Sequence, residues 1–168
     1  MMEIEKAIQY LQLNVNRNKK LISYFEKEGF DIAKALSVED GFDDGGIYKG
    51  DGELYLENTN SGFCFLLRTE NSLYKKNHHL PIVEGDWVFT TIFLYSEGKD
   101  EYKQFQGVLP YDISFGETED TMTKKIGVEP DLVNNFIRKW NNLNGVELSL
   151  SSIEDNKPKV IIVSKFVL

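Results

Sequence analysis

The sequence predicts an α+β fold, an antiparallel β-sheet with N-terminal helices and one later helix packed on one face. Three observations support this class. Before residue 30, apolar residues recur every three or four positions, which is the period of a helix. After Gly41, short alternating runs are separated by glycine and aspartate clusters, which is typical of strands and hairpins. A helix-capping signal stands at Thr118.

Two N-terminal helices are expected at about residues 2–12 and 17–28. Asparagines at positions 14, 16 and 18 interrupt the helical spacing between them, and Gly29 ends the second helix. Residues 32–36 add a short helical piece.

The first strands are expected as a hairpin of residues 53–57 and 63–67, because alternating residues stand on both sides of a polar turn. Residues 87–95 form the longest β-rich run, so the central sheet should be built around them. After a turn, residues 101–105 are expected to return beside that strand. The aromatics that alternate along 87–95 should fill core, and they are Trp87, Phe89, Phe93 and Tyr95.

The segment 109–130 combines several structural signals. Pro110 biases the preceding leucine toward extended geometry, and Ile113 and Phe115 lie two apart, so they should point inward from a buried strand tip. Thr118 is the expected N-cap of a helix that ends at Gly127.

This segment resembles the pattern LP-x-x-[apolar]-x-F-G … G-x-x-P of bacterial polymorphic-toxin immunity proteins, including those of contact-dependent growth inhibition systems. Family members place an acidic, glycine-containing stretch before the motif, here residues 40–46, and a strand pair after it, here 146–150 and 160–163. The helix after Phe-Gly departs from the family, because it is rich in threonine and carries two lysines where Arg and Glu are usual. The resemblance favours a strand over a helix end for residues 136–140.

The composition, through its net charge, indicates which class of partner the protein is expected to bind. The 168 residues suit a single domain over 1–168, with a formal charge of −8 from 27 acidic and 19 basic residues. That charge opposes binding to nucleic acid and favours a basic protein. Acidic residues gather in two segments, Glu39–Glu57, where only Lys49 offsets them, and Asp100–Asp120.

The sequence lacks the residue patterns that several other functions require. No nucleophile elbow, phosphate-binding loop or zinc motif is present, and the single cysteine, Cys64, cannot form an internal disulfide. A calcium loop starting at Asp40 fails because Phe42 stands at its third position. The adjacent His78 and His79 diverge too far to share a metal and suit an exposed basic loop. We therefore expect no cofactor and no metal, and, without a secretion signal or apolar span, a cytoplasmic location and no membrane contact.

The resemblance implies an immunity protein that neutralises a cognate toxin domain, a nuclease with a basic surface, as a heterodimer that covers the toxin's active site. Eight residues are the expected contacts: six carboxylates in the acidic segments, and two aromatics that follow an acidic turn and should be exposed. They are Asp40, Asp43, Asp44, Glu117, Glu119, Asp120, Tyr102 and Phe105. Strand addition at a sheet edge is an alternative docking mode. The alternative function is a small-molecule hydrolase or ligand-binding domain with a cleft between sheet and helices.

Overall fold

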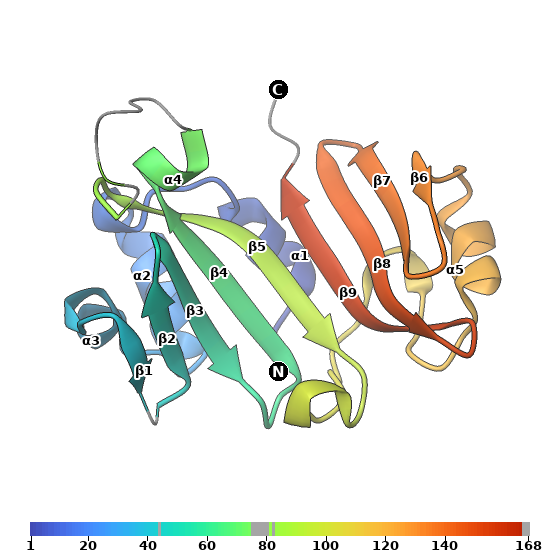
Figure 1. Ribbon diagram of the computed structural model, residues 1–168, viewed down its shortest axis with the longest axis horizontal. Coiled ribbons are helices and arrows are strands. Elements are labelled where there is room, and N and C mark those ends of the chain that lie inside the picture. Colours follow the sequence, from blue (N-terminus) through green and yellow to red (C-terminus); the bar gives the residue numbers. More distant parts are fainter. Residues whose placement is uncertain (44, 75–80, 82, 166–168) are drawn as a thin grey trace. The chain divides into compact units, whose positions relative to one another are not determined.

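The computed structural model describes residues 1–43, 45–74, 81 and 83–165 (Figure 1). It confirms the α+β class: within these residues, nine strands form an antiparallel sheet in the order β1-β2-β3-β4-β5-β9-β8-β7-β6. The chain divides into two compact units. Unit 1 comprises residues 1–9, 58–63 and 91–168, and unit 2 comprises 10–57 and 64–90. The single domain over 1–168 stays a prediction.

Unit 2 is built from helices that precede its strands. Its helices and strands, including three strands that lie partly in unit 1 (β3, β4 and β5), are η1 (Val15–Arg17), α2 (Lys19–Lys27), α3 (Ile32–Ser37), β1 (Gly41–Asp43), β2 (Ile47–Gly50), β3 (Glu53–Asn58), β4 (Phe63–Thr69), α4 (Glu70–Tyr74) and β5 (Trp87–Tyr95). The side chain of Asn18 caps α2 by accepting from the Leu21 amide, and Asp31 caps α3 in the same way. The expected second helix, the short helical piece and the 53–67 hairpin are confirmed.

The core of unit 2 is aromatic. Phe25 of α2 packs against Phe65 of β4 and Phe89 of β5, with ring centroids 5.5 and 5.1 Å apart. Figure 1 shows α2 behind strands β2 to β4, which agrees with these contacts. All three rings are fully buried, so the hydrophobic effect stabilises this layer.

Unit 1 contains the helix of the 109–130 segment and the C-terminal strands. Its elements are α1 (Ile4–Tyr10), whose last residue belongs to unit 2, η2 (Lys99–Glu101), η3 (Pro110–Asp112), α5 (Glu119–Ile126), β6 (Leu132–Val133), β7 (Ile137–Leu143), β8 (Val146–Glu154) and β9 (Lys157–Lys165). The β8–β9 hairpin keeps one register around a turn at Asp155 and Asn156, with the pairing interrupted at Ser152, whose φ is 50°. The expected first helix and the strands after residue 136 are confirmed. The Thr118 cap is also confirmed, since Thr118 Oγ1 accepts from the Thr121 amide, as is the stop at Gly127, whose φ is 76°.

The predicted return strand at residues 101–105 is wrong. In the sheet order, β5 already has β4 on one side and β9 on the other, so no edge is left for a further strand. Asp100 and Glu101 adopt positive φ angles of 50° and 66°, and the chain then follows irregular backbone, in which the Phe105 amide donates to the Tyr95 carbonyl.

Two expectations about burial also need correction. No strand forms at residues 113–115, because Tyr111 and Asp112 both have positive φ and turn the chain first; Ile113 is buried, but Phe115 is only half-buried. Phe93 of β5 is half-buried as well, and so is Ile162 opposite it in β9, so this face of the β5–β9 pair is not fully covered at that position. Tyr95 is likewise half-buried.

No helix in the described ranges is long and apolar enough to cross a membrane.

Candidate protein-binding surface

The first acidic segment supplies one exposed carboxylate and one structural carboxylate. Asp40 is exposed, and no hydrogen bond or ion pair engages it within the described residues. Asp43 Oδ1 accepts from the Gly45 amide at 2.8 Å and from Lys34 Nζ at 3.1 Å. The Gly45 bond, followed by the Lys34 bond, lowers the pKa of Asp43. Asp43 therefore fastens β1 to α3, while Asp44 lies outside the described residues.

An aromatic row crosses the first three strands on their open side. Phe42 of β1 is directly opposite Tyr48 of β2, and Tyr48 is directly opposite Tyr55 of β3, so the three side chains share one face of the sheet. Phe42 is 69% exposed and Tyr48 43% exposed, and the Tyr48 and Tyr55 rings lie 5.9 Å apart. We call Phe42, Tyr48 and Tyr55 the aromatic face.

The lysine of this segment points to the other side. Lys49 is paired with the buried Leu54, so alternation places both on the face opposite the aromatic row. Its Nζ donates to the carbonyls of Leu36 and Val38, at 3.0 and 2.9 Å, at the end of α3. It also lies 5.4 Å from the centre of the Trp87 ring. The acidic charge beside the aromatic face is therefore not offset by the segment's own lysine.

At the β3 end of the aromatic face, which we call its inner end, a three-residue network holds Tyr55 in place. Glu53 Oε1 accepts from Arg68 Nε at 2.9 Å, and Glu53 Oε2 accepts from the Tyr55 hydroxyl at 2.8 Å. Burial, together with the bond to Glu53, raises the pKa of Tyr55 above its ordinary value, so the phenol keeps its proton. This network holds one arginine, one carboxylate and one aromatic ring together on the sheet.

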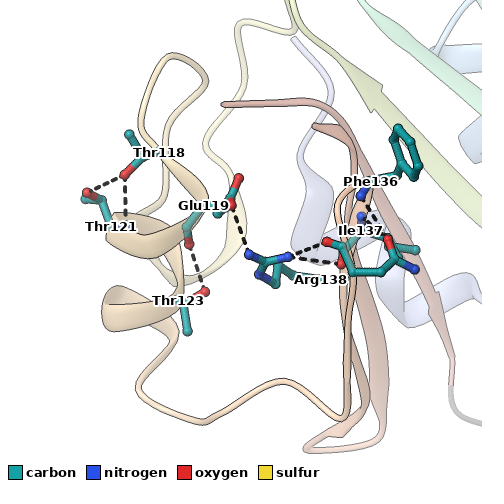
Figure 2. Close-up of polar contacts among 8 residues, drawn as sticks. Thr118, Glu119, Thr121, Thr123, Phe136, Ile137 and Arg138 are labelled. Atoms are coloured by element: carbon teal, nitrogen blue, oxygen red, sulfur yellow. Dashed lines mark hydrogen bonds and ion pairs between the residues drawn. The ribbon is translucent and has the colours of Figure 1, made fainter. Parts of the chain in front are cut away.

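The second acidic segment is largely used inside the protein. Glu119 is 8% exposed, and its Oε1 accepts from Arg138 Nη2 at 2.9 Å. Arg138 Nη1 donates to the Asn134 carbonyl at 2.6 Å, while Asn134 Oδ1 accepts from the amides of Phe136 and Ile137. Figure 2 shows Arg138 between Glu119 and the turn before Phe136. We call Glu119, Asn134 and Arg138 the Glu119 cluster; it holds a turn on which Phe136 is 72% exposed.

Glu117 is also engaged, whereas Asp120 is not. Glu117 accepts from Lys125 Nζ at 2.6 Å and from the Ser114 amide at 2.9 Å, and the Lys125 bond is the main cause that lowers the pKa of Glu117. Asp120 is exposed, without a hydrogen bond or ion pair in the described part of the chain. The structure therefore leaves one of the three predicted carboxylates here open to a partner.

The prediction that Tyr102 and Phe105 are exposed is wrong. They are 5% and 4% exposed, because the two positive φ angles just before them return the chain against the end of β5. Tyr102 stacks on Tyr95 with ring centroids 3.7 Å apart. The ring of Phe105 occupies the space that a side chain at Gly107 would need. A partner can therefore reach neither ring without local rearrangement.

Sequence reasoning missed Phe42 and Tyr48 as candidate contacts. The signal was present, because Tyr48 sits between Ile47 and Lys49 in an alternating run that follows a glycine turn. Recognising that run as β2, paired with a strand at Phe42, would have placed both aromatics on the same face.

Two hollows on unit 1 differ in their lining, and one of about 250 Å³ includes Asp112 and Ser114. A cleft of about 510 Å³ is lined by residues 1–5 and 108–110, and the described residues along it include two carboxylates, Glu3 and Glu5, but no Ser, Cys or His. In the described ranges, no group of three or more His, Cys, Asp and Glu side chains is placed to hold a metal ion. His78 and His79 lie outside the described residues.

No known family model, curated protein or solved structure matches this chain.

Proposed function

We propose that this protein is an immunity protein that binds a cognate toxin domain, a nuclease with a basic surface, and neutralises it by covering its active site. The observation that carries the proposal is the aromatic face, whose exposed Phe42 lies two residues after the exposed Asp40, while Lys49 is turned to the opposite side. The LP-x-x-[apolar]-x-F-G pattern at residues 109–116 supports the same proposal through its resemblance to immunity proteins.

The physical basis is competition for a cationic surface. A nuclease needs Lys and Arg side chains to hold phosphates, so a partner that presents carboxylates can occupy those side chains and exclude substrate. Exposed aromatic side chains provide the desolvated contacts that dominate many protein interfaces. A chain of charge −8 is itself repelled by nucleic acid, so the proposed contact is with the toxin alone.

The proposed complex is a heterodimer that forms in the cytoplasm, where an immunity protein meets a toxin that has entered the cell. No cofactor takes part, since charge complementarity and apolar contact suffice for inhibition.

Co-expression tests the proposal. The open reading frame next to this gene is expected to encode the toxin domain, and inducing that domain alone should stop growth. Growth should be restored when this protein is co-expressed, and the two chains should co-purify. Absence of both protection and a complex, with a domain that is toxic by itself, would contradict the proposed function.

A further inference from the structure

We infer that the aromatic face binds arginine side chains of the cationic partner, in preference to lysine. The identity of that partner rests on the proposed function, whereas the preference for arginine rests on the geometry of Phe42, Tyr48 and the neighbouring carboxylate.

The rings offer flat surfaces to a partner. Phe42 and Tyr48 are 69% and 43% exposed although they are paired in the middle of a strand pair. Gly50 leaves room for Tyr48 to lie along its own strand, because the Tyr48 hydroxyl is 3.3 Å from the position that a Cβ of residue 50 would take. A ring that lies along the sheet presents its face outward.

The carboxylate closest in the chain before these rings, Asp40, is not paired with a cation of the described residues. Asp40 lies two residues before Phe42, is exposed, and is not engaged by any cation of the described chain. Lys34 is held by Asp43, and Lys49 is held by the carbonyls that follow α3. A cation that reaches Phe42 therefore lies two residues from a carboxylate that none of the described lysines occupies.

The same sheet face holds one arginine through a carboxylate. The guanidinium of Arg68 pairs with Glu53, and Glu53 in turn accepts from Tyr55, at the inner end of the aromatic row. At the outer end, Asp40 supplies a carboxylate two residues before the exposed ring of Phe42. A planar guanidinium can stack on a ring and donate to a carboxylate together, whereas the ammonium of lysine is a compact and strongly hydrated charge.

The matched control is on the other unit. Phe136 is 72% exposed on a turn, with Leu132 and Val133 of β6 exposed nearby in sequence. The nearest carboxylate of that network, Glu119, is buried and already paired with Arg138. Phe136 therefore offers an exposed ring with no unpaired carboxylate in its network, so it should not select arginine.

Two short peptides of equal length and charge test the inference, one alternating arginine with threonine and the other alternating lysine with threonine. Binding is followed by amide chemical shifts of the ¹⁵N-labelled protein at low salt. The arginine peptide should bind about three- to fivefold more tightly. It should shift the amides of residues 40–43 and 47–50. Phe42→Ala combined with Tyr48→Thr should abolish the preference, and Phe136→Ala should retain it. The spectra of the variants also report whether they remain folded.

Equal affinity for the two peptides, or shifts centred on residues 132–138, would overturn the inference. Failure of the proposed function gives a different result. If the arginine preference is found but the neighbouring toxin domain forms no complex, the inference stands and the proposed function fails. If the toxin domain binds and Phe42→Ala with Tyr48→Thr has no effect on it, the proposed function stands and the inference fails.

Discussion

The aromatic face and the Glu119 cluster both arise from acid-rich segments, but only the first leaves its charge open to solvent. In the Glu119 cluster, Arg138 reaches the carboxylate from β7 and neutralises it. Beside the aromatic face, the register of β2 turns Lys49 to the opposite side of the sheet. The charge available to a partner therefore depends on which side each cation faces, and not on the number of acidic residues.

This difference predicts that the Glu119 cluster affects the stability of the fold, whereas the aromatic face affects the binding of a partner. A buried carboxylate with a single cationic partner contributes to folding through that pair, because removing the partner leaves an uncompensated charge. An exposed carboxylate contributes little to folding but can attract a cationic protein. The Glu119 cluster should therefore respond to substitution by losing stability, and the aromatic face by losing binding.

The largest effect is expected for Arg138→Ala. The side chains of Arg138 and Glu119 are 17% and 11% exposed, so the variant leaves a buried carboxylate without its cation. It should lose about 3 kcal/mol of unfolding free energy, measured by urea denaturation.

The control is Arg17→Ala, which removes another arginine–carboxylate pair. The Arg17 side chain is 74% exposed and pairs with Asp86, so its loss should cost less than about 1 kcal/mol. Equal costs for the two variants would show that the Glu119 cluster is no more important to folding than a surface pair.

A smaller effect is expected for Glu117→Gln, and it should depend on pH. The folded-state pKa of Glu117 is lowered below the ordinary value of 4.5, mainly by Lys125. Its contribution is therefore complete above that ordinary value and is lost as the pH falls through the folded-state pKa. The variant should be less stable than the wild type at pH 6 by less than about 1 kcal/mol, because the pair is partly exposed, and the difference should shrink below about pH 4.

Lys125→Met is the matched variant, since it removes the same ion pair from the other side. Denaturation curves across this pH range should show the same loss of acid dependence in both variants. A difference that persists unchanged into acid would mean that Glu117 acts through packing and not through its charge.

Much of the fold could be predicted from local signals. The helix that Thr118 begins and Gly127 ends was predictable because its cap and stop are both local. The return strand at residues 101–105 could not be excluded from the sequence, because its place beside β5 is taken by β9, which lies more than 50 residues later in the chain. The alternation of apolar and polar residues within one segment does not show which distant strand pairs beside it.

The candidate site was predictable in part, for the same reason. Asp40 was correctly placed on an open surface, whereas Glu119 was predicted as a contact and is paired with Arg138, 19 positions further along the chain. Tyr102 and Phe105 are buried because of two left-handed residues that do not include glycine, and such turns leave no clear mark in a sequence.

Association kinetics with the toxin domain show whether the carboxylates that precede the aromatic face attract the partner. Glu39→Gln with Asp40→Asn removes two exposed carboxylates that precede the aromatic face in the chain, and Asp120→Asn with Glu129→Gln removes two exposed carboxylates from unit 1. At low salt, the first pair should slow association about threefold or more and flatten its salt dependence, while the second pair should leave both nearly unchanged. If the two pairs slow association equally, or if neither changes it, then the aromatic face is not where the negative charge of this protein meets its partner.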